Sequence, residues 1–424
     1  MIRTTFEQRR DLERLEPEAL TQLQLDRLNN LLERILPTNR FYAEKLAETR
    51  WPLESLDQLG ELPFTFKDEL ALTTAGGFSP NLTYPIQEYT RFHRTSGTRG
   101  KPIVVLDTPD DWQWWIDLWQ FVLDAAEVNS ADRVLMAFSF GPFIGFWSAS
   151  EAAIARGSLV IPGGGLSTLA RLELIRTSQA TVICCTPSYA LHMAEVAEEH
   201  QIDTAALNVR RIVVAGEPGG SIPAIRQRIE AAWNARVVDH AGATEVGPWG
   251  YADRAGRGLH IVESEFIPEF LSVETGQPAV EGELAELVLT TLNRTGCPVI
   301  RYRTGDLVKP TWNAVGENRF VLIDGGVLNR TDDMLVVRGM NIFPSAVEQI
   351  LCSFPEVVEY RITAHRVGEM DALTVEIEDR LEQPERVRQE LNLRLGLNVQ
   401  VQCVPLESLP RFEGKGKRFI DRRD

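Results

Sequence analysis

Between about residues 133 and 233 the chain alternates short apolar runs with amphipathic stretches, and this alternation constrains the fold most. Four apolar runs are predicted as buried strands: residues 133–140, 157–164, 180–187 and 210–218. Three amphipathic segments between them predict helices: residues 168–179, 188–200 and 221–233. Alternating strands and helices indicate a parallel sheet with helices on its faces, so we expect an α/β domain of layered sheets and helices.

A second block of elements begins near residue 330. Before it, residues 7–50 are predicted to be helical, and two strands are predicted after residue 260, at 282–292 and 298–308. The second block reads strand, helix, strand, strand, helix, strand: residues 334–342, 344–354, 358–367, 373–379, 384–396 and 399–406. We therefore expect a large domain over residues 1–329 and a small, mobile α+β domain over residues 330–424.

Charge and composition exclude several classes of function. The 424 residues carry a formal net charge of −16, which argues against non-specific binding to nucleic acid or to an anionic membrane. The first twenty residues are charged and lack the apolar core of a signal peptide. Five scattered cysteines fit reduced thiols in a cytoplasmic protein. Because the net charge is negative, an anionic ligand would need a local pocket of particular cationic groups.

A loop rich in hydroxyls and glycine, Thr95-Ser96-Gly97-Thr98-Arg99-Gly100-Lys101, could surround a polyphosphate with N–H and hydroxyl donors. Pro102 stands where a Walker A loop needs Ser or Thr after its lysine, so the loop is not of that type. Taken alone, the loop also fits a polar hairpin turn.

Two further turns follow predicted strands. Gly216-Glu217-Pro218 comes directly after the run 210–214, where ligands of open α/β sheets bind, although an ordinary strand-ending turn fits as well. Ala243-Thr244-Glu245 follows a short apolar run, and the carboxylate of Glu245 could hold Mg²⁺ together with phosphate oxygens.

Three more motifs lie toward the C-terminus. Asp306, on a glycine turn that we expect to follow a strand, is suited to a bidentate contact with ribose hydroxyls. Arg330 and Asp332 fall where the two predicted domains meet. Lys415 is near the end of the chain, where a lone lysine is usually solvated.

In their order and spacing, these six motifs resemble the signature of the acyl-adenylate-forming (AMP-binding) ligase superfamily. Further matches place the resemblance in the phenylacetate–CoA ligase-like branch, over residues 39 to 423: Asn39-Arg40-Phe41-Tyr42, Leu62-Pro63-Phe64-Thr65 and Arg338-Gly339-Met340-Asn341-Ile342-Phe343-Pro344. The resemblance implies an enzyme that activates a small carboxylic acid with ATP and passes the acyl group to a thiol.

The resemblance also implies roles for single residues. Lys415, Thr244 and Glu245 would be catalytic, with Glu245 on Mg²⁺ and Lys415 between the acid and the α-phosphate; Lys417 is a rival candidate on chemical grounds. ATP and AMP would be bound by Thr95, Ser96, Gly97, Thr98, Gly100, Lys101, Gly216, Glu217, Pro218, Ala243, Thr244, Asp306 and Arg330. Asp332 would be the hinge of the mobile domain, and Gly339 would face the thiol tunnel.

Three departures from the pattern of the family are visible. Arg99 replaces a threonine that is common in the phosphate loop, and Ala241 stands where most relatives carry an aromatic residue. The stretch 311–326 lacks the cysteine cluster of many branch members, so we expect no zinc.

The segment 138–147 is rich in aromatic residues and carries no charge. We expect Phe140, Phe143 and Ile144 to line an acyl pocket that favours an aromatic monocarboxylate, although the same rings also fit an ordinary core.

The partners that the resemblance implies are a small acid, ATP, and CoA or a carrier-protein pantetheine. Transfer to an amine or another nucleophile is an open alternative, and so is a non-catalytic nucleotide-binding protein. Oligomeric state stays open, with a homodimer as one option.

Overall fold

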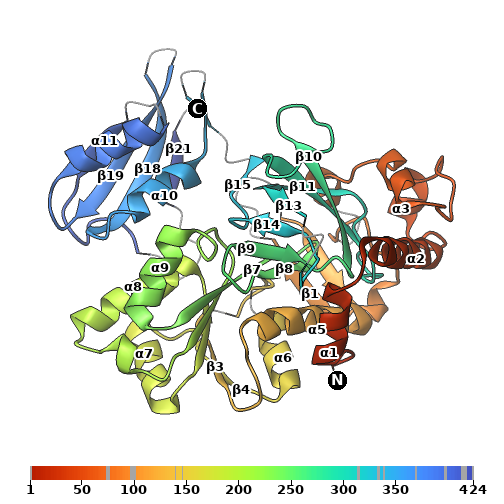
Figure 1. Ribbon diagram of the computed structural model, residues 1–424, viewed down its shortest axis with the longest axis horizontal. Coiled ribbons are helices and arrows are strands. Elements are labelled where there is room, and N and C mark those ends of the chain that lie inside the picture. The colour runs from red at the N-terminus through yellow and green to blue at the C-terminus, as the bar shows by residue number, and fades with distance from the viewer. Residues whose placement is uncertain are drawn as a thin grey trace.

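The computed structural model describes residues 2–72, 77–95, 102–138, 140–145, 147–312, 316–331, 335–337, 340–367, 370–395, 399–411 and 418–422. Figure 1 shows a large N-terminal domain, which holds most of the strands and helices, and a smaller C-terminal domain beside α8 and α9. In the part of the chain that the structure describes, no helix combines the length and the apolar character that a membrane crossing requires.

The centre of the large domain is a nine-stranded sheet whose order is β13-β14-β9-β8-β7-β6-β5-β3-β4. Its parallel half contains the four strands predicted from apolar runs: β3 (Arg133–Met136), β4 (Leu159–Pro162), β5 (Val182–Cys185) and β6 (Arg211–Val214). A fifth parallel strand, β7 (Arg236–Ala243), pairs with β6 and is not among the predicted strands. The helices that alternate with these strands are α6 (Trp147–Arg156), α7 (Thr168–Ser178), α8 (Pro187–Glu199) and α9 (Pro223–Trp233). The predicted parallel α/β arrangement is confirmed, although β3 ends at Met136 and not at residue 140.

The other half of this sheet is antiparallel. It consists of β8 (Gly247–Ala252), β9 (Gly258–Ile261), β14 (Leu322–Asp324) and β13 (Pro310–Thr311). Strands β7 and β8 form a hairpin, with His240 opposite Tyr251 and Ala243 opposite Gly247. Residues 244–246 are therefore the turn of that hairpin.

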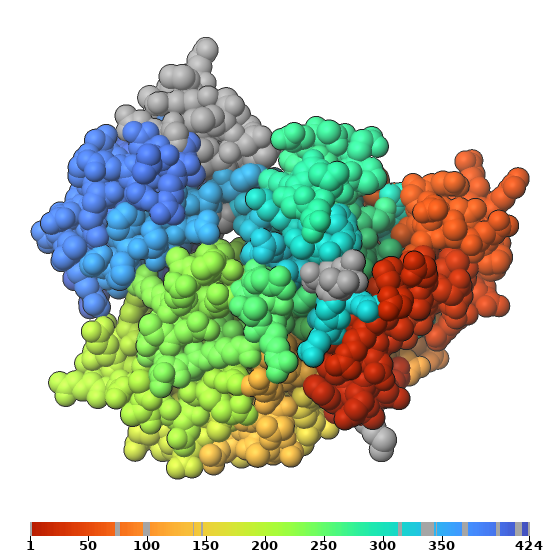
Figure 2. All heavy atoms as spheres, in the orientation of Figure 1, coloured from red at the N-terminus to blue at the C-terminus, as the bar shows by residue number. Residues whose placement is uncertain are grey.

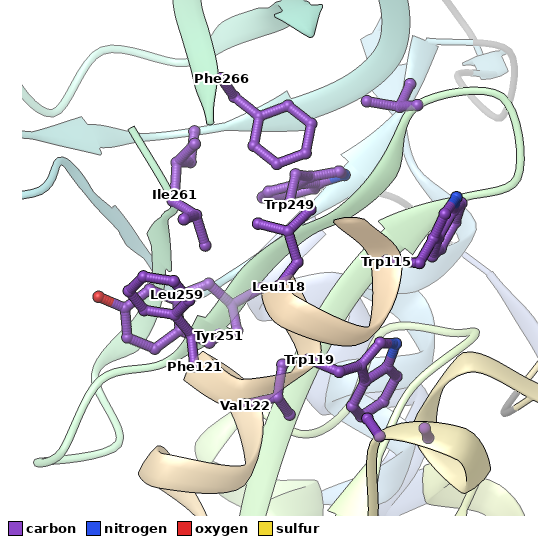
Figure 3. Packing of buried hydrophobic residues seen from close by; sticks show 14 of the residues in the cluster. Trp115, Leu118, Trp119, Phe121, Val122, Trp249, Tyr251, Leu259, Ile261 and Phe266 are labelled. Atoms are coloured by element: carbon purple, nitrogen blue, oxygen red, sulfur yellow. The ribbon is translucent and has the colours of Figure 1, made fainter. Parts of the chain in front are cut away.

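Helix α5 (Pro109–Ala125) packs against this antiparallel half and is not among the predicted helices. Thr108 caps it in a capping box with Asp111, and Pro109 occupies its first position. Its tryptophans are buried in the largest hydrophobic cluster, and Figure 3 shows Leu118 of this helix pointing toward Trp249. The ring of Trp114 lies 5.4 Å from that of Phe266, between centroids. Truncating a core tryptophan to alanine usually costs about 3–5 kcal/mol, so this helix is a main source of stability.

A second sheet has the order β10-β11-β12-β15, made of β10 (Phe266–Ser272), β11 (Ala285–Thr291), β12 (Tyr302–Val308) and β15 (Asn329–Arg330). Beside it, β1 (Arg91–Arg94) and β2 (Val104–Asp107) form an antiparallel hairpin. Asp306 lies inside β12, within the predicted range 298–308, and not in a turn that follows the strand. Gly305, with φ +73°, supplies the sharp local backbone turn within the strand.

The N-terminal segment is helical as predicted. Its helices are α1 (Phe6–Glu13), α2 (Pro17–Ile35) and α3 (Arg40–Lys45), and shorter pieces follow: η1 (Leu56–Glu61), α4 (Lys67–Leu70) and η2 (Ile86–Glu88). A further short helix, η3 (Thr204–Ala206), precedes β6. The apolar face of α2, which includes Leu28, Leu32 and Ile35, packs against Ile267 and Ile300. This packing attaches the N-terminal helices to the second sheet.

The C-terminal domain contains a four-stranded sheet of order β20-β19-β18-β21. Its elements are β16 (Leu335–Val337), β17 (Met340–Ile342), α10 (Pro344–Cys352), β18 (Val357–Val367), β19 (Met370–Asp379), α11 (Pro384–Leu395), β20 (Gln400–Cys403) and β21 (Phe419–Arg422). The single strand predicted over 334–342 is wrong, because β16 and β17 are two antiparallel strands. Strand β21 is not among the predicted strands. It pairs with β18, which lies more than fifty positions earlier in the chain.

The boundary at residues 329/330 stays a prediction. Asn329 and Arg330 pair with Leu307 and Asp306 in the large-domain sheet. From β18 onward, the strands pair among themselves and enclose a separate hydrophobic cluster that includes Val347, Ile362 and Leu391. Figure 2 shows the blue C-terminal domain in contact with the green segment of the large domain.

Candidate active site

A cleft of about 890 Å³ lies between the large domain and the C-terminal domain. Eight of the predicted site residues line it: Thr95, Ile144, Glu217, Pro218, Ala243, Thr244, Glu245 and Arg330. The opposite wall comes from the C-terminal domain and includes Pro344, Glu348, Tyr360, Arg418 and Phe419. The fold thus brings together groups from motifs that are up to 235 positions apart in the chain.

The turn Thr244–Glu245 projects into the cleft from the β7–β8 hairpin. Gly242 permits the tight approach of the two strands, because a Cβ there would lie 2.9 Å from the carbonyl oxygen of Gly247. Both Thr244 and Glu245 are buried. The hydroxyl of Tyr302 donates a hydrogen bond of 2.8 Å to Glu245 Oε1, which holds one carboxylate oxygen in place.

The turn Gly216-Glu217-Pro218 connects β6 to the segment before α9. Gly216 has φ +94°, which favours glycine. The carboxylate of Glu217 accepts a 2.8 Å hydrogen bond from the backbone N–H of Ser188, in the first turn of α8. This contact satisfies an N–H that the helix leaves unpaired, and it fixes the orientation of the turn.

Asp306 and Arg330 lie opposite each other on β12 and β15. Arg330 Nη1 donates to Asp306 Oδ1 at 2.9 Å, and its Nη2 donates to the carbonyl of Thr304 at 2.9 Å. Arg330, the cation of this pair, lines the cleft. Asp306, predicted to contact ribose, and Arg330, predicted to bind the nucleotide, are therefore adjacent.

The aromatic segment after β3 is divided between core and surface. Phe140 packs edge-on against Trp147, with ring centroids 4.5 Å apart, and it also contacts Phe138 in a tilted arrangement at 4.8 Å. Phe143 is 46% exposed, and Ile144 lines the cleft. Of the three residues predicted for the acyl pocket, Ile144 is the one that the structure brings to the cleft wall.

Eight predicted site residues lie outside the described residues: Ser96, Gly97, Thr98, Gly100, Lys101, Asp332, Gly339 and Lys415. The phosphate loop begins at Thr95, whose backbone N–H donates to Ile103 and whose hydroxyl accepts from the N–H of Ile103, both at 3.0 Å. These two bonds close the β1–β2 hairpin from which the loop extends.

Several residues that line the cleft escaped the motif search. Ser188, Leu191, His192 and Glu195 form one face of α8 at the spacing i, i+3, i+4, i+7. The periodicity predicts the helix, but it cannot tell which face meets a cleft. The cleft residues of the C-terminal domain, such as Tyr360 and Arg418, carry no motif at all.

Burial and charge shape the electrostatics of the cleft. Burial raises the pKa of Tyr302 well above its usual range, and the neighbouring Glu245 carboxylate raises it further, so Tyr302 stays a hydroxyl donor at neutral pH. Burial opposes the charge of Arg418, but hydrogen bonds and ion pairing with Glu359 outweigh it and raise the pKa of Arg418. Arg418 is therefore a permanent cation on the wall formed by the C-terminal domain.

Among the described residues, no group of three or more His, Cys, Asp or Glu side chains is arranged to hold a metal ion. The cysteines are free, and burial raises the pKa of Cys184 and of Cys297 to about 12. Such thiols carry no charge at neutral pH and act as small apolar side chains.

A larger cavity of about 1200 Å³ lies elsewhere, between α1 and the ends of β8 and β9. It is lined by many arginines, but Arg9 and Arg156 both pair with Asp124, and Arg257 pairs with Asp253. None of the predicted site residues that the structure describes lines this cavity.

Comparison with known proteins agrees with this geometry. Residues 93–280 match the family model described as AMP-binding enzyme, and residues 339–423 match the AMP-binding enzyme C-terminal domain. The phenylacetate-coenzyme A ligase of Thermus thermophilus is 31% identical over 446 aligned residues, which cover 97% of this chain and 99% of that relative.

Two solved structures of 2-hydroxyisobutyryl-CoA ligase, each 25% identical, differ in how well they superpose on this chain. The postadenylation state with 2-HIB-AMP gives a TM-score of 0.91 over 99% of this chain and 94% of that chain. The thioesterification state with 2-HIB-AMP and CoA gives 0.73 over the same shares. The chain as a whole therefore superposes better on the postadenylation structure than on the thioesterification structure.

The chain belongs to the AMP-binding enzyme family of adenylate-forming ligases. Within that family it falls in the phenylacetate–CoA ligase-like branch, and it is an AMP-forming acid–thiol ligase that acts through an acyl-adenylate.

Proposed function

We propose that this enzyme activates a small aromatic monocarboxylate with ATP and transfers the acyl group to CoA. The observation that carries the proposal is the cleft itself, which gathers the turns at 216–218 and 243–245 with Thr95 and Arg330 and faces a separate domain. The names of its relatives at 31% identity support CoA as the acceptor and an arylacetic acid as the substrate class.

Two bond exchanges make up the reaction. In the first, a carboxylate oxygen of the acid attacks the α-phosphorus of ATP, and pyrophosphate leaves as its bond to that phosphorus breaks. In the second, the CoA sulfur attacks the acyl carbon, and AMP leaves with the electrons of the broken C–O bond. The first step brings together two anions, so cations and N–H donors must offset their charge.

The nucleotide would be held by groups from four segments of the large domain. Gly216, Glu217 and Pro218 would lie against adenine, while the bond from Ser188 to Glu217 keeps this turn rigid. Asp306, supported by Arg330, would bind the ribose hydroxyls. The loop from Thr95 to Lys101 would receive the β- and γ-phosphates, and Ala243 would contact the α-phosphate region.

Glu245 would provide a protein ligand for Mg²⁺. The fit rests on its buried place in the cleft wall, and on Tyr302, which takes up Oε1 so that Oε2 can face a cation. Bound Mg²⁺ would neutralise part of the phosphate charge. Thr244, on the same turn, would hydrogen-bond the reacting phosphate.

The C-terminal domain would serve the two half-reactions in turn. Lys415 would bridge the carboxylate and the α-phosphate during adenylation, and a swing about Asp332 would then remove it and bring Gly339 to the thiol tunnel. Such gating is common where one site must accept two successive reactants.

An aromatic acid is favoured by the uncharged aromatic segment after β3, in which Phe140 and Phe143 precede Ile144. Flat rings accommodate a flat substrate by stacking or edge contacts. The structural relative named for the small aliphatic 2-hydroxyisobutyryl group defines the competing substrate class.

The test is acid-dependent exchange of labelled pyrophosphate into ATP, measured against aryl, short aliphatic, long-chain and amino acids, followed by product analysis with free CoA. We expect the highest kcat/KM for an aryl acid and an acyl-CoA product. A preference for a non-aromatic class would refute the aromatic assignment. Adenylate formation without acyl-CoA would point to a carrier-protein pantetheine or an amine as the acceptor.

A further inference from the structure

Glu245 is held by a side chain that comes from a different sheet. Tyr302 begins β12, 57 positions along the chain, and its hydroxyl donates to Glu245 Oε1 at 2.8 Å. Tyr302 is 1% exposed, and its ring belongs to the main hydrophobic cluster. A donor in such a position can reorient very little, so it selects one carboxylate orientation.

The backbone that presents Tyr302 is itself fixed on both sides. Thr65 forms a parallel bridge with Tyr302: its N–H donates to the carbonyl of Arg301 at 2.9 Å, and its carbonyl accepts from Arg303 at 3.0 Å. On the other side Tyr302 pairs with Leu289 of β11. The phenol ring therefore has little freedom to move away from Glu245.

A second buried residue holds the same turn through its backbone. Arg294, fully buried, donates from Nη1 to the carbonyl of Thr244 at 3.2 Å. Its guanidinium is anchored on Asp107 Oδ1 by two bonds, from Nε at 3.0 Å and from Nη2 at 2.6 Å. Arg294 thus restrains the backbone of the turn, and Tyr302 restrains the carboxylate.

We propose that Tyr302 is a positioning residue for metal-dependent nucleotide binding: by occupying Glu245 Oε1 it presents Oε2 to the Mg²⁺ of MgATP. This inference rests on the proposed function, since it assumes that Glu245 faces the metal. Tyr302 contributes no metal ligand of its own. Its contribution is to remove the need for the carboxylate to reorganise when the metal binds.

The chain offers a matched control. Tyr251 is 2% exposed, and its hydroxyl donates to the buried carboxylate of Glu13 at 2.6 Å, on the wall of the other cavity. Tyr302→Phe and Tyr251→Phe each remove one hydroxyl that serves a buried carboxylate. The two variants should therefore lose similar amounts of thermal stability. If Tyr302 had only a structural role, the two variants would also have similar effects on nucleotide binding.

The experiment measures ATP binding by calorimetry in saturating Mg²⁺ and in EDTA, and Mn²⁺ binding to the enzyme–ATP complex by electron paramagnetic resonance. Tyr302→Phe should weaken ATP binding in Mg²⁺, and Mn²⁺ binding, by about tenfold, the usual scale of one hydrogen bond to a charged group. In EDTA it should bind ATP like the wild type, and Tyr251→Phe should match the wild type under both conditions.

A double-mutant cycle completes the design. In the Glu245→Gln background, Tyr302→Phe should have little further effect on MgATP binding, since the group that it positions is gone. The proposal would be overturned if Tyr302→Phe and Tyr251→Phe had equal effects on ATP binding, or if the effects of Tyr302→Phe and Glu245→Gln were additive. It would also be overturned if Tyr302→Phe lost the same affinity in Mg²⁺ and in EDTA, or if the wild type bound no MgATP. Absence of acid-dependent pyrophosphate exchange in a wild type that binds MgATP would instead refute the proposed function alone.

Discussion

Asp306 and Arg330 form their ion pair across neighbouring strands, and each is 36% exposed or less at its side chain. The pair does two things at once. It closes the edge of the second sheet through the β12–β15 register, and it orients the carboxylate near the cleft that Arg330 lines. We therefore expect substitutions at this pair to affect nucleotide binding more than the packing of the core.

Asp306→Asn should raise the KM for ATP by about 10- to 100-fold, because it removes charge-assisted hydrogen bonds to ribose hydroxyls and leaves Arg330 without its carboxylate partner. Steady-state kinetics with ATP and with a ribose-modified analogue measure the effect. With the wild type, the analogue should have a KM above that of ATP by the same factor. With the variant, replacing ATP by the analogue should raise the KM little further. An unchanged KM for ATP would contradict the ribose assignment.

Lys415→Ala should lower the rate of adenylate formation by at least about 100-fold and leave thioester formation from presynthesised adenylate near the wild-type rate. The lysine would stabilise charge in the first transition state alone, so the half-reactions should separate. Single-turnover assays of each half-reaction provide the measurement, with Lys417→Ala as the control. If Lys417→Ala shows this pattern and Lys415→Ala does not, the assignment moves to Lys417.

At the scale of elements, α1 is attached to the large domain by buried charge. Arg9 donates to both oxygens of Asp124 at the end of α5, and Glu13 accepts from Tyr251 of β8. Glu13 also pairs with Arg10 on its own helix. Burial raises the pKa of Glu13 to about 7, although Arg10 and Tyr251 act in the opposite direction.

This pKa gives the stability a pH dependence of definite sign. The folded pKa of Glu13 lies above the ordinary value of 4.5, so the folded state favours the protonated form, and stability is lost as the pH rises from about 4.5 to about 7. The loss is about 3 kcal/mol at most.

Glu13→Gln should abolish that part of the pH dependence, so the variant gains stability relative to the wild type across this window. Urea unfolding at several pH values measures the difference, with the exposed Glu18→Gln as the control. Parallel pH profiles for the wild type and Glu13→Gln would contradict the prediction.

For the molecule as a whole, the described contacts that dock the C-terminal domain on α8 and α9 include polar and apolar ones. Arg228 of α9 donates to the carbonyl of Val357 at 3.3 Å, and Arg380 pairs with Glu198 at 3.3 Å on the exposed surface. Cys352 of α10 packs against the apolar cluster around α8 and α9. An interface of this kind is suited to reversible docking, which two half-reactions would require.

Cys352→Asp should lower the rate of adenylation by about tenfold or more and spare thioester formation, because a charge in this apolar contact disfavours the docked arrangement. Cys352→Ser, which loses the thiol without adding charge, should show a smaller loss. The half-reactions are followed as for Lys415, and thermal unfolding verifies that the domain is folded. Equal loss in both half-reactions would show that this contact does not favour one arrangement.

Much of the architecture could be predicted because it depends on local pattern. The strands and helices between residues 133 and 233 are all present, since a buried strand or an amphipathic helix is recognisable from its own side chains. Helices α5 and α6 are not among the predicted helices. Buried residues occur on every side of α5, so its sequence lacks the narrow apolar stripe of a surface helix.

The sequence by itself determined the fold class, the family resemblance and the identity of the motifs, because these depend on residue type, order and spacing. Tertiary structure decided which motif residues share a cleft, that Asp306 pairs with Arg330 across β12 and β15, and that Ile144 lines the cleft while Phe140 packs against Trp147. It also decided the partners of the Thr244–Glu245 turn, which are Tyr302 and Arg294. These contacts join segments about fifty positions apart, and Arg294 is anchored on Asp107, 187 positions away. Such pairings arise from the packing of sheets on one another, so no local pattern of residues records them.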